Sequence, residues 1–521
     1  MIRNYKVYLI ALIIFISAYS ILGFNLGGQG IYIDELFRHS SGLTWYDSVM
    51  KGDLLNPCIT GIGDCHTFNT KCAEMWPNIL SLNTGGIIKG MFIGIGDEFF
   101  SETERTYYAG LEPCRPIHNN ISVPGVNIPS SHELGAARFF SPILGSIAVV
   151  VSFLIGRTLF SNLVGIVFAS VLLFHSLWML YSRTIESEIF QMFFMLLSIL
   201  LILHWVKNQD RTQIKYLVLG AITFALAINV KLTSLELLPL LFIMILWRSD
   251  IKKKFHIAQI KDKKFLSKSI FLISVFSIIV FSTVIITNPY YYVDPIGQLE
   301  IQYQTLQDLE SYFAASHPPW SPLQKFYMPF LGTFSATIYP AIDTYYYIFD
   351  PDNTPQSVID GHTFISVSLT ILFFVGVWYL LRKIRKKELL FSEFLIATWF
   401  VSFFIIISLN VESFTVTKYY VPMILPIVLI MAYGFVNCLN RIFNKAIQKI
   451  FFITTIVTHA ITYLIFWENI YFNPEKIWRL PFDINFQKSI LDPVVLLCSV
   501  IFLISFFIII GMKAKSRQIF G

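Results

Sequence analysis

The sequence has little charge. Asp, Glu, Lys and Arg make up 14% of the 521 residues, while 55% of the residues are hydrophobic and 16% are aromatic. A water-soluble protein of this length needs more charged side chains to cover its surface. The sequence also lacks a P-loop and a glycine-rich dinucleotide turn, so nothing indicates nucleotide binding. The composition therefore predicts an all-α, polytopic membrane protein.

Long apolar runs recur along the chain, and most are long enough to cross a bilayer as a helix. We predict about twelve transmembrane helices on this basis. They cover Val7–Phe24, Arg138–Gly156, Leu163–Tyr181, Ile189–Val206, Tyr216–Val230, Leu232–Trp247, Ile270–Thr287, Thr363–Leu381, Phe394–Leu409, Tyr419–Leu439, Ile450–Trp467 and Leu491–Gly511. Tyr216–Val230 and Leu232–Trp247 are short, so one broken helix or a re-entrant hairpin is the alternative there.

The basic residues are sorted by side, which predicts the orientation. Most of the 39 Lys and Arg residues fall in loops on the same side as the N-terminus. The positive-inside rule then places both termini in the cytoplasm of a multi-pass protein of the cell (plasma) membrane. Because these residues are not clustered with stacking aromatics, the net charge of +6 does not indicate nucleic-acid binding.

This orientation divides the chain into five parts, two of which are long extracytoplasmic loops that we expect to be folded. They are a first transmembrane helix (1–24), an extracytoplasmic loop (25–137), helices two to seven (138–287), a second extracytoplasmic loop (288–361), and the last five helices with a cytoplasmic tail (362–521). A cleaved signal sequence is the alternative for the first part, but its apolar core is longer than that of a typical signal.

Four of the six cysteines lie in the first loop, where they face an oxidising compartment. These are Cys58, Cys65, Cys72 and Cys114. Two disulfides are the natural interpretation, and three connectivities are possible. A zinc site that includes His66 is the alternative, although the loop has no Cys-x-x-Cys spacing. Cys438 and Cys498 lie in apolar runs and are interpreted as buried packing residues.

An acidic pair, Asp34-Glu35, directly follows the first apolar run. Adjacent side chains on a helix point about 100° apart, so one carboxylate can face a cavity while neighbours hold the other. We interpret Asp34 as the general base of a membrane-embedded transferase and Glu35 as its supporting acid. The alternative is a solvated pair that only fixes the helix at the membrane surface.

Several cations lie at the predicted outer ends of the helices. Arg138 opens the second apolar run, where it can either reach lipid headgroups or hold a phosphate through a two-pronged contact. Lys231 is the only charge in an apolar turn, which is costly without an anionic partner. Arg183 lies three residues before Glu186, and an ion pair within the helix is the structural alternative. Together with the acidic pair, these cations predict an anion pocket.

The order of these features resembles that of the GT-C glycosyltransferases, of the dolichyl-phosphate-mannose protein mannosyltransferase and lipid A aminoarabinose transferase type. The resemblance is carried by Asp34-Glu35, Met75-Trp76-Pro77-Asn78, the Arg138-led second span, Gly156-Arg157-Thr158, Ser182-Arg183-Thr184-Ile185-Glu186 and Lys418-Tyr419-Tyr420. It implies a GT-C helix bundle in which Asp34 acts as the base. It also implies that Arg138, Lys89, Arg183 and Lys231 lie near the lipid phosphate.

Two departures from the family pattern affect the acceptor. Family members commonly have a His-Pro-Pro or Lys-Pro-Pro segment where this chain has Trp76-Pro77-Asn78, and the lectin-like domain of the eukaryotic enzymes has no counterpart here. The resemblance implies transfer of a sugar, a mannose-like hexose, from a polyprenyl- or dolichyl-phosphate donor. The acceptor is then a hydroxyl of a protein, a lipid or a cell-wall polymer.

The chemistry expected of such a site is an inverting transfer without a metal or another cofactor. The attacking hydroxyl loses its proton to a carboxylate, and cations stabilise the leaving phosphate. A transporter or flippase for a lipid-linked saccharide is the competing interpretation. A proton-coupled carrier needs carboxylates near the middle of the membrane, and Glu236 is the one candidate there.

Overall fold

The computed structural model of the chain describes eleven stretches of it. These are residues 2–23, 26, 35–56, 86–101, 131–207, 214–246, 263–301, 304, 321–326, 367–410 and 421–440. Within them the regular elements are helices, and no β-strand occurs. Six of these helices are long and apolar enough to cross a membrane. The prediction of a polytopic helical membrane protein is therefore confirmed, while the number of twelve helices stays a prediction.

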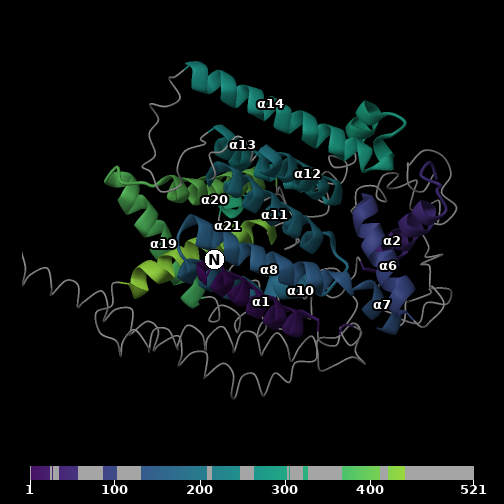
Figure 1. Ribbon diagram of the computed structural model, residues 1–521, viewed down its shortest axis with the longest axis horizontal. Coiled ribbons are helices and arrows are strands. Elements are labelled where there is room, and N and C mark those ends of the chain that lie inside the picture. Colours follow the sequence, from purple (N-terminus) through teal and green to yellow (C-terminus); the bar gives the residue numbers. More distant parts are fainter. Residues whose placement is uncertain are drawn as a thin grey trace, which may run out of the picture.

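One group of helices forms the centre of the bundle (Figure 1). Helix α8 (Phe140–Leu159) packs against α1 (Ile2–Leu22), α9 (Asn162–Leu173) and α11 (Ser187–Lys207), and α11 packs against α12 (Ile214–Val230). A Cβ atom on Gly156 of α8 would lie 2.8 Å from the Cα atom of Gly165 on α9. The missing side chains therefore let the two helix backbones approach closely, as is common between membrane helices.

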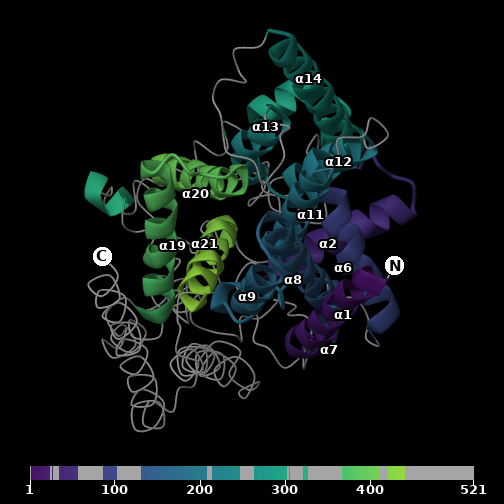
Figure 2. The same cartoon turned by 60° about the vertical axis from the view of Figure 1, so that its left-hand side comes forward.

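A second group lies beside the first (Figure 2). It consists of α19 (Val367–Arg385), α20 (Phe391–Asn410) and α21 (Val421–Leu439), and α21 also packs against α9. A Cβ atom on Gly434 of α21 would lie 2.6 Å from the backbone nitrogen of Gly376 on α19. Facing glycines therefore let α19 and α21 approach closely as well.

The segment from α12 to α14 contains the two short predicted spans, Tyr216–Val230 and Leu232–Trp247. Helix α12 ends at Val230, Lys231 is extended (φ −159°, ψ 126°), and a 3₁₀ helix, η2 (Leu232–Leu237), leads into α13 (Leu238–Leu246). The extended Lys231 therefore interrupts the helical hydrogen bonds between the two runs, and how they cross the membrane stays a prediction. Helix α14 (Lys263–Ile286) then packs against both α12 and α13.

Three helices of the predicted first loop gather beyond one end of the bundle, on the right in Figure 1. They are α2 (Glu35–Met50), α6 (Gly86–Phe100) and α7 (Ser131–Ala137). Helix α6 packs against both α2 and α7. A Cβ atom on Gly94 would lie 2.2 Å from Cβ of Tyr46, so α2 and α6 cross closely only because Gly94 has no side chain. We call these three helices the cap.

The prediction of one continuous span over Leu163–Tyr181 is wrong. Helix α9 ends at Leu173, and a separate short helix, α10 (Ser176–Tyr181), follows. The break occurs because His175 has an extended backbone (φ −75°, ψ 126°) and its N–H bonds to Leu172. The predicted spans Ile450–Trp467 and Leu491–Gly511 lie outside the described residues.

Candidate active site

The turn from Tyr181 to Glu188, which joins α10 to α11, collects charged side chains from distant parts of the chain. Arg183, Glu186 and Glu188 in this turn are all fully buried. Nε of Arg38, from α2, lies 2.7 Å from Oε2 of Glu186. Nζ of Lys231, after α12, donates a hydrogen bond of 2.6 Å to Oε1 of Glu188. We call residues 181–188 the charged turn.

Glu35 and Arg138 form a two-pronged ion pair next to the charged turn. Nε of Arg138 donates to Oε1 of Glu35 at 2.8 Å, and Nη2 donates to Oε2 at 2.5 Å. Both side chains are fully buried. The N–H of Ile185 also donates to Oε1 of Glu35, at 3.1 Å, and Nη1 of Arg138 donates to the carbonyl of Leu26 at 2.8 Å. The pair therefore joins the start of α2 to the start of α8 and to the charged turn.

Two cations of the cap meet at the first residue of α11. Nη1 of Arg38 donates to Oγ of Ser187 at 2.6 Å, and Nζ of Lys89 lies 3.4 Å from the same oxygen. Lys89 is fully buried. The positive end of the α11 dipole lies at this point as well, so positive charge and N–H donors converge there. Such a place favours a bound anion.

Charged side chains from five segments of the chain meet around the turn. The cations are Arg38, Lys89, Arg138, Arg183 and Lys231, and the carboxylates are Glu35, Glu186 and Glu188. Cations that converge beside the N-terminus of a helix favour an anion that enters this region.

The structure brings the four predicted cations to one place. Arg138 reaches it through Glu35, Lys89 through Ser187, Lys231 through Glu188, and Arg183 lies in the turn, where Nη1 donates to the carbonyl of Leu22. Their contact with a phosphate stays a prediction. Glu186 forms an ion pair with Arg38 of α2, a partner that the sequence spacing did not indicate.

Sequence reasoning missed Arg38 as a member of the site. Arg38 lies three residues after Glu35, so both project from the same side of α2. That spacing was the available signal. Asp34 lies outside the described residues, and so do Cys58, Cys65, Cys72, Cys114 and His66. Cys438, within the described part, is buried, as predicted.

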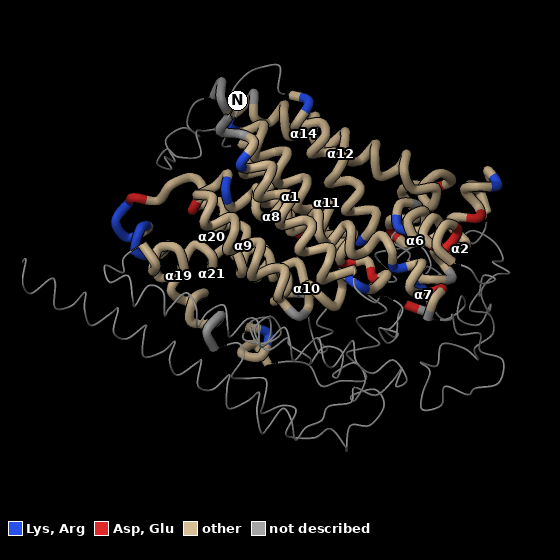
Figure 3. Tube along the Cα trace, turned by 60° about the horizontal axis from the view of Figure 1, so that its bottom comes forward, with Lys and Arg blue, Asp and Glu red and all other residues tan. Residues whose placement is uncertain are grey.

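The opposite ends of the same helices carry basic residues. Helices α8 and α11 start at the charged turn and end near Arg157 and Lys207. Helix α12 runs the other way, from near Lys215 to the charged turn. Figure 3 shows the charges mainly at the helix ends, with uncharged lengths between them. This arrangement agrees with the orientation predicted from the basic loops, which stays a prediction.

One known protein family matches part of the chain. Residues 114–294 match the model of the dolichyl-phosphate-mannose-protein mannosyltransferase family. The resemblance to the GT-C glycosyltransferases is confirmed. The matched segment contains Arg138, the charged turn and Lys231, and it excludes the acidic pair and Lys89.

The chain is also similar to two proteins of known structure. ArnT from Cupriavidus metallidurans, solved bound to undecaprenyl phosphate, has 10% identity and a TM-score of 0.45, over 96% of this chain and 75% of that chain. The oligosaccharyltransferase AglB from Archaeoglobus fulgidus, in complex with an inhibitory peptide and a dolichol-phosphate, has 12% identity and a TM-score of 0.48. That match covers 88% of this chain and 55% of AglB. No curated protein sequence matches the chain.

Proposed function

We propose that this protein is an integral membrane glycosyltransferase that moves a sugar from a polyprenyl-phosphate donor to an acceptor hydroxyl. The observation that carries the proposal is the convergence of Arg38, Lys89 and the N-terminus of α11 on Ser187, beside the Glu35–Arg138 pair. A lipid-linked phosphate supplies the negative charge that this region stabilises. A lipid tail on that phosphate also keeps the donor at a membrane-embedded site.

The leaving group explains why the cations are needed. When the bond from the sugar to the phosphate breaks, negative charge grows on the phosphate oxygens. Preplaced donors stabilise this charge in the transition state more strongly than in the ground state. We assign this role to Lys89 and Arg38, which converge on Ser187 at the N-terminus of α11. Arg183 and Lys231 add positive charge on the same turn.

Glu35 and Arg138 take a positioning role in this proposal. The three hydrogen bonds that Glu35 accepts from Arg138 and from Ile185 N–H fix the first residue of α2. Asp34 directly precedes that residue in the sequence. A general base must be held within hydrogen-bond reach of the attacking hydroxyl, and fixing its neighbour achieves this. We therefore keep Asp34 as the base of an inverting transfer.

The family match suggests the first donor to test. Because the matching model describes dolichyl-phosphate-mannose-protein mannosyltransferases, we propose a mannose-like hexose on a polyprenyl phosphate. A monophosphate leaving group can be neutralised by lysine and arginine, so the transfer step itself needs no metal ion. The acceptor is an extracytoplasmic hydroxyl of a protein, a lipid or a cell-wall polymer.

The test is direct. The purified chain in detergent is incubated with a panel of radiolabelled polyprenyl-phosphate sugars, and both label transfer and release of lipid phosphate are followed. We expect Asp34→Asn to lower turnover by about 10²- to 10⁴-fold, since the base contributes about that much. Asp53→Asn, which changes an exposed acid just after α2, is the matched control and should retain activity.

Two outcomes would contradict the proposal. Near-normal turnover by Asp34→Asn would show that Asp34 is not the general base. Movement of the labelled lipid across reconstituted vesicles with no cleavage of the sugar–phosphate bond by any donor would favour the flippase interpretation.

A further inference from the structure

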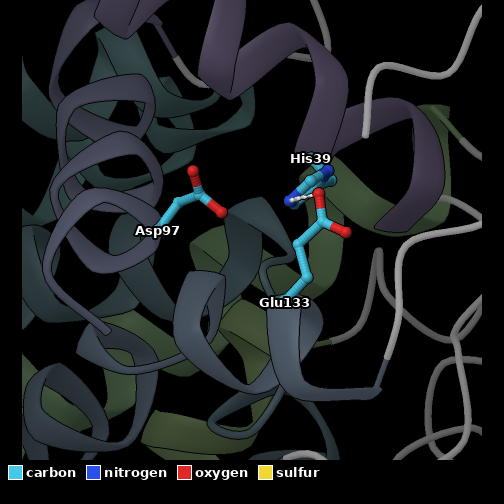
Figure 4. Close-up of side chains that lie close together, drawn as sticks. All are labelled: His39, Asp97 and Glu133. Carbon is cyan, nitrogen blue, oxygen red and sulfur yellow. Dashed lines mark ion pairs between the residues drawn. The ribbon is translucent and has the colours of Figure 1, made fainter. Parts of the chain in front are cut away.

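Three side chains with metal-binding groups converge inside the cap. His39 of α2, Asp97 of α6 and Glu133 of α7 are all buried, with exposed fractions of 0%, 2% and 1%. Their nearest ligand atoms all lie within 4.8 Å of one another, and Nε2 of His39 lies 3.8 Å from Oε1 of Glu133. In Figure 4 the carboxylate of Asp97 points toward the space beside the His39 ring and the Glu133 carboxylate.

We propose that these three residues form a structural binding site for a divalent transition metal, with Zn²⁺ as the best fit. Zinc accepts one histidine nitrogen and carboxylate oxygens at about 2.0–2.2 Å, usually with tetrahedral geometry. Two such ligands then lie about 3.3–3.5 Å apart. The observed 3.8 Å between His39 and Glu133 needs only a small closure to reach this value.

Charge and ligand type support a divalent ion. Two ionised carboxylates and a neutral imidazole carry a charge of minus two, and a divalent cation among them makes the buried group neutral. Imidazole suits zinc and other transition ions, whereas calcium and magnesium prefer oxygen ligands alone. The mixed ligand set therefore favours a transition metal over either of these ions.

The position of the site gives it a structural role. His39 lies one helical turn after Glu35, and Glu133 lies five residues before Arg138. A metal ion here therefore ties together the same two segments that the Glu35–Arg138 pair joins, and it adds α6, which carries Lys89. Two separate contacts, the Glu35–Arg138 pair and the metal site, then stabilise the cap. This inference does not depend on sugar transfer, because the three ligands are not among the residues around the charged turn.

The competing explanation is an ion-pair network in which a protonated His39 lies between the two carboxylates. Metal content of the intact chain separates the two explanations. The full-length protein is purified in detergent without chelator, and its bound metals are measured by inductively coupled plasma mass spectrometry. We expect about one equivalent of a divalent transition metal per chain, as for structural sites.

Two matched pairs of variants locate the metal. Asp97→Asn and Glu133→Gln should lose it, while Glu98→Gln and His132→Gln, which change exposed neighbours of the same residues, should keep it. Chelation with EDTA should lower the Tm of the wild type, and added Zn²⁺ should restore it, because a metal that binds only the folded state stabilises that state. The Tm of Asp97→Asn should respond to neither treatment.

A spectroscopic measurement covers the case in which the ligand variants do not fold. Co²⁺ replaces the native ion in the wild-type protein, and we expect absorption bands typical of a site with nitrogen and oxygen ligands. The proposal is overturned if the wild type is purified without metal and neither its Tm nor its spectrum responds to Zn²⁺ or Co²⁺. It is also overturned if Glu98→Gln and His132→Gln lose as much metal as the ligand variants.

Discussion

The two ends of the helix bundle both contain ion pairs, and the pairs differ in burial and in sequence separation. At the cap end, Glu35 and Arg138 are 103 residues apart, and neither side chain is exposed. At the opposite end, Lys383 and Glu393 are 10 residues apart, and the lysine side chain is 34% exposed. The oxygens of Glu393 also accept from the hydroxyl of Tyr433, at 2.7 Å, and from the N–H of Leu390, at 2.9 Å.

The difference indicates which charges the bundle needs for its own stability. An ion pair that water can reach contributes little and serves mainly to anchor a helix end at the membrane surface. Burial of several charges from five separate segments is costly, and packing alone does not require it. The cap end therefore has the features of a functional site, while the other end has the features of a membrane anchor.

The largest expected effect comes from breaking the buried pair. Glu35→Gln leaves the Arg138 guanidinium buried without its carboxylate, which should destabilise the protein by about 3–5 kcal/mol. The measurement is thermal unfolding in detergent, followed by the loss of monodisperse protein. The double variant Glu35→Leu with Arg138→Met removes both charges and should be more stable than Glu35→Gln. A double variant that is no better than the single one would show that packing, not charge, explains the loss.

A smaller effect should follow when a buried cation beside Ser187 is removed. Lys89→Met keeps the aliphatic stem and deletes the charge beside Ser187. We expect the apparent affinity for the lipid-linked sugar to fall by about ten- to a hundredfold, the range for hydrogen bonds to charged groups. Donor titration measures this, with Lys51→Met as the control because Lys51 is exposed at the end of α2. Unchanged affinity together with unchanged turnover in Lys89→Met would exclude Lys89 from the donor site.

The smallest effect is expected at the opposite end of the bundle. Lys383→Met should cost less than Glu35→Gln, because Lys383 is partly solvated and the buried Glu393 keeps its bonds to Tyr433 and Leu390. Sugar transfer should be unchanged. If this variant were as unstable as Glu35→Gln in the same unfolding measurement, the contrast between the two ends would be lost.

Much of the fold could be predicted from the sequence because local hydropathy marks each helix. The start of α11 at Ser187 and the end of α21 at Leu439 lie within two residues of the predicted bounds. The break between α9 and α10 was not predicted, since the residues around His175 are as apolar as a helix interior. An extended backbone at one residue leaves no mark in a hydropathy average.

The candidate site was predicted in its composition but not in its contacts. The acidic pair and the four cations stood out as charges in apolar surroundings, which is a local property. That Glu35 binds the guanidinium of Arg138, and that Glu186 pairs with Arg38, depends on how α2 docks on α8 and α11. Sequence spacing does not report such contacts, because they form between segments far apart in the chain.

The amino-acid sequence by itself determined which segments are apolar helices and which charges lie at their ends, because the free energy of entering a bilayer is summed residue by residue along each segment. Only the tertiary structure decided which of those charges meet. His39, Asp97 and Glu133 are separated by a long stretch of chain, and they come together because α6 packs against both α2 and α7. Ion pairing and metal ligation act over a few ångströms, so they depend on the docking of helices and not on the order of residues.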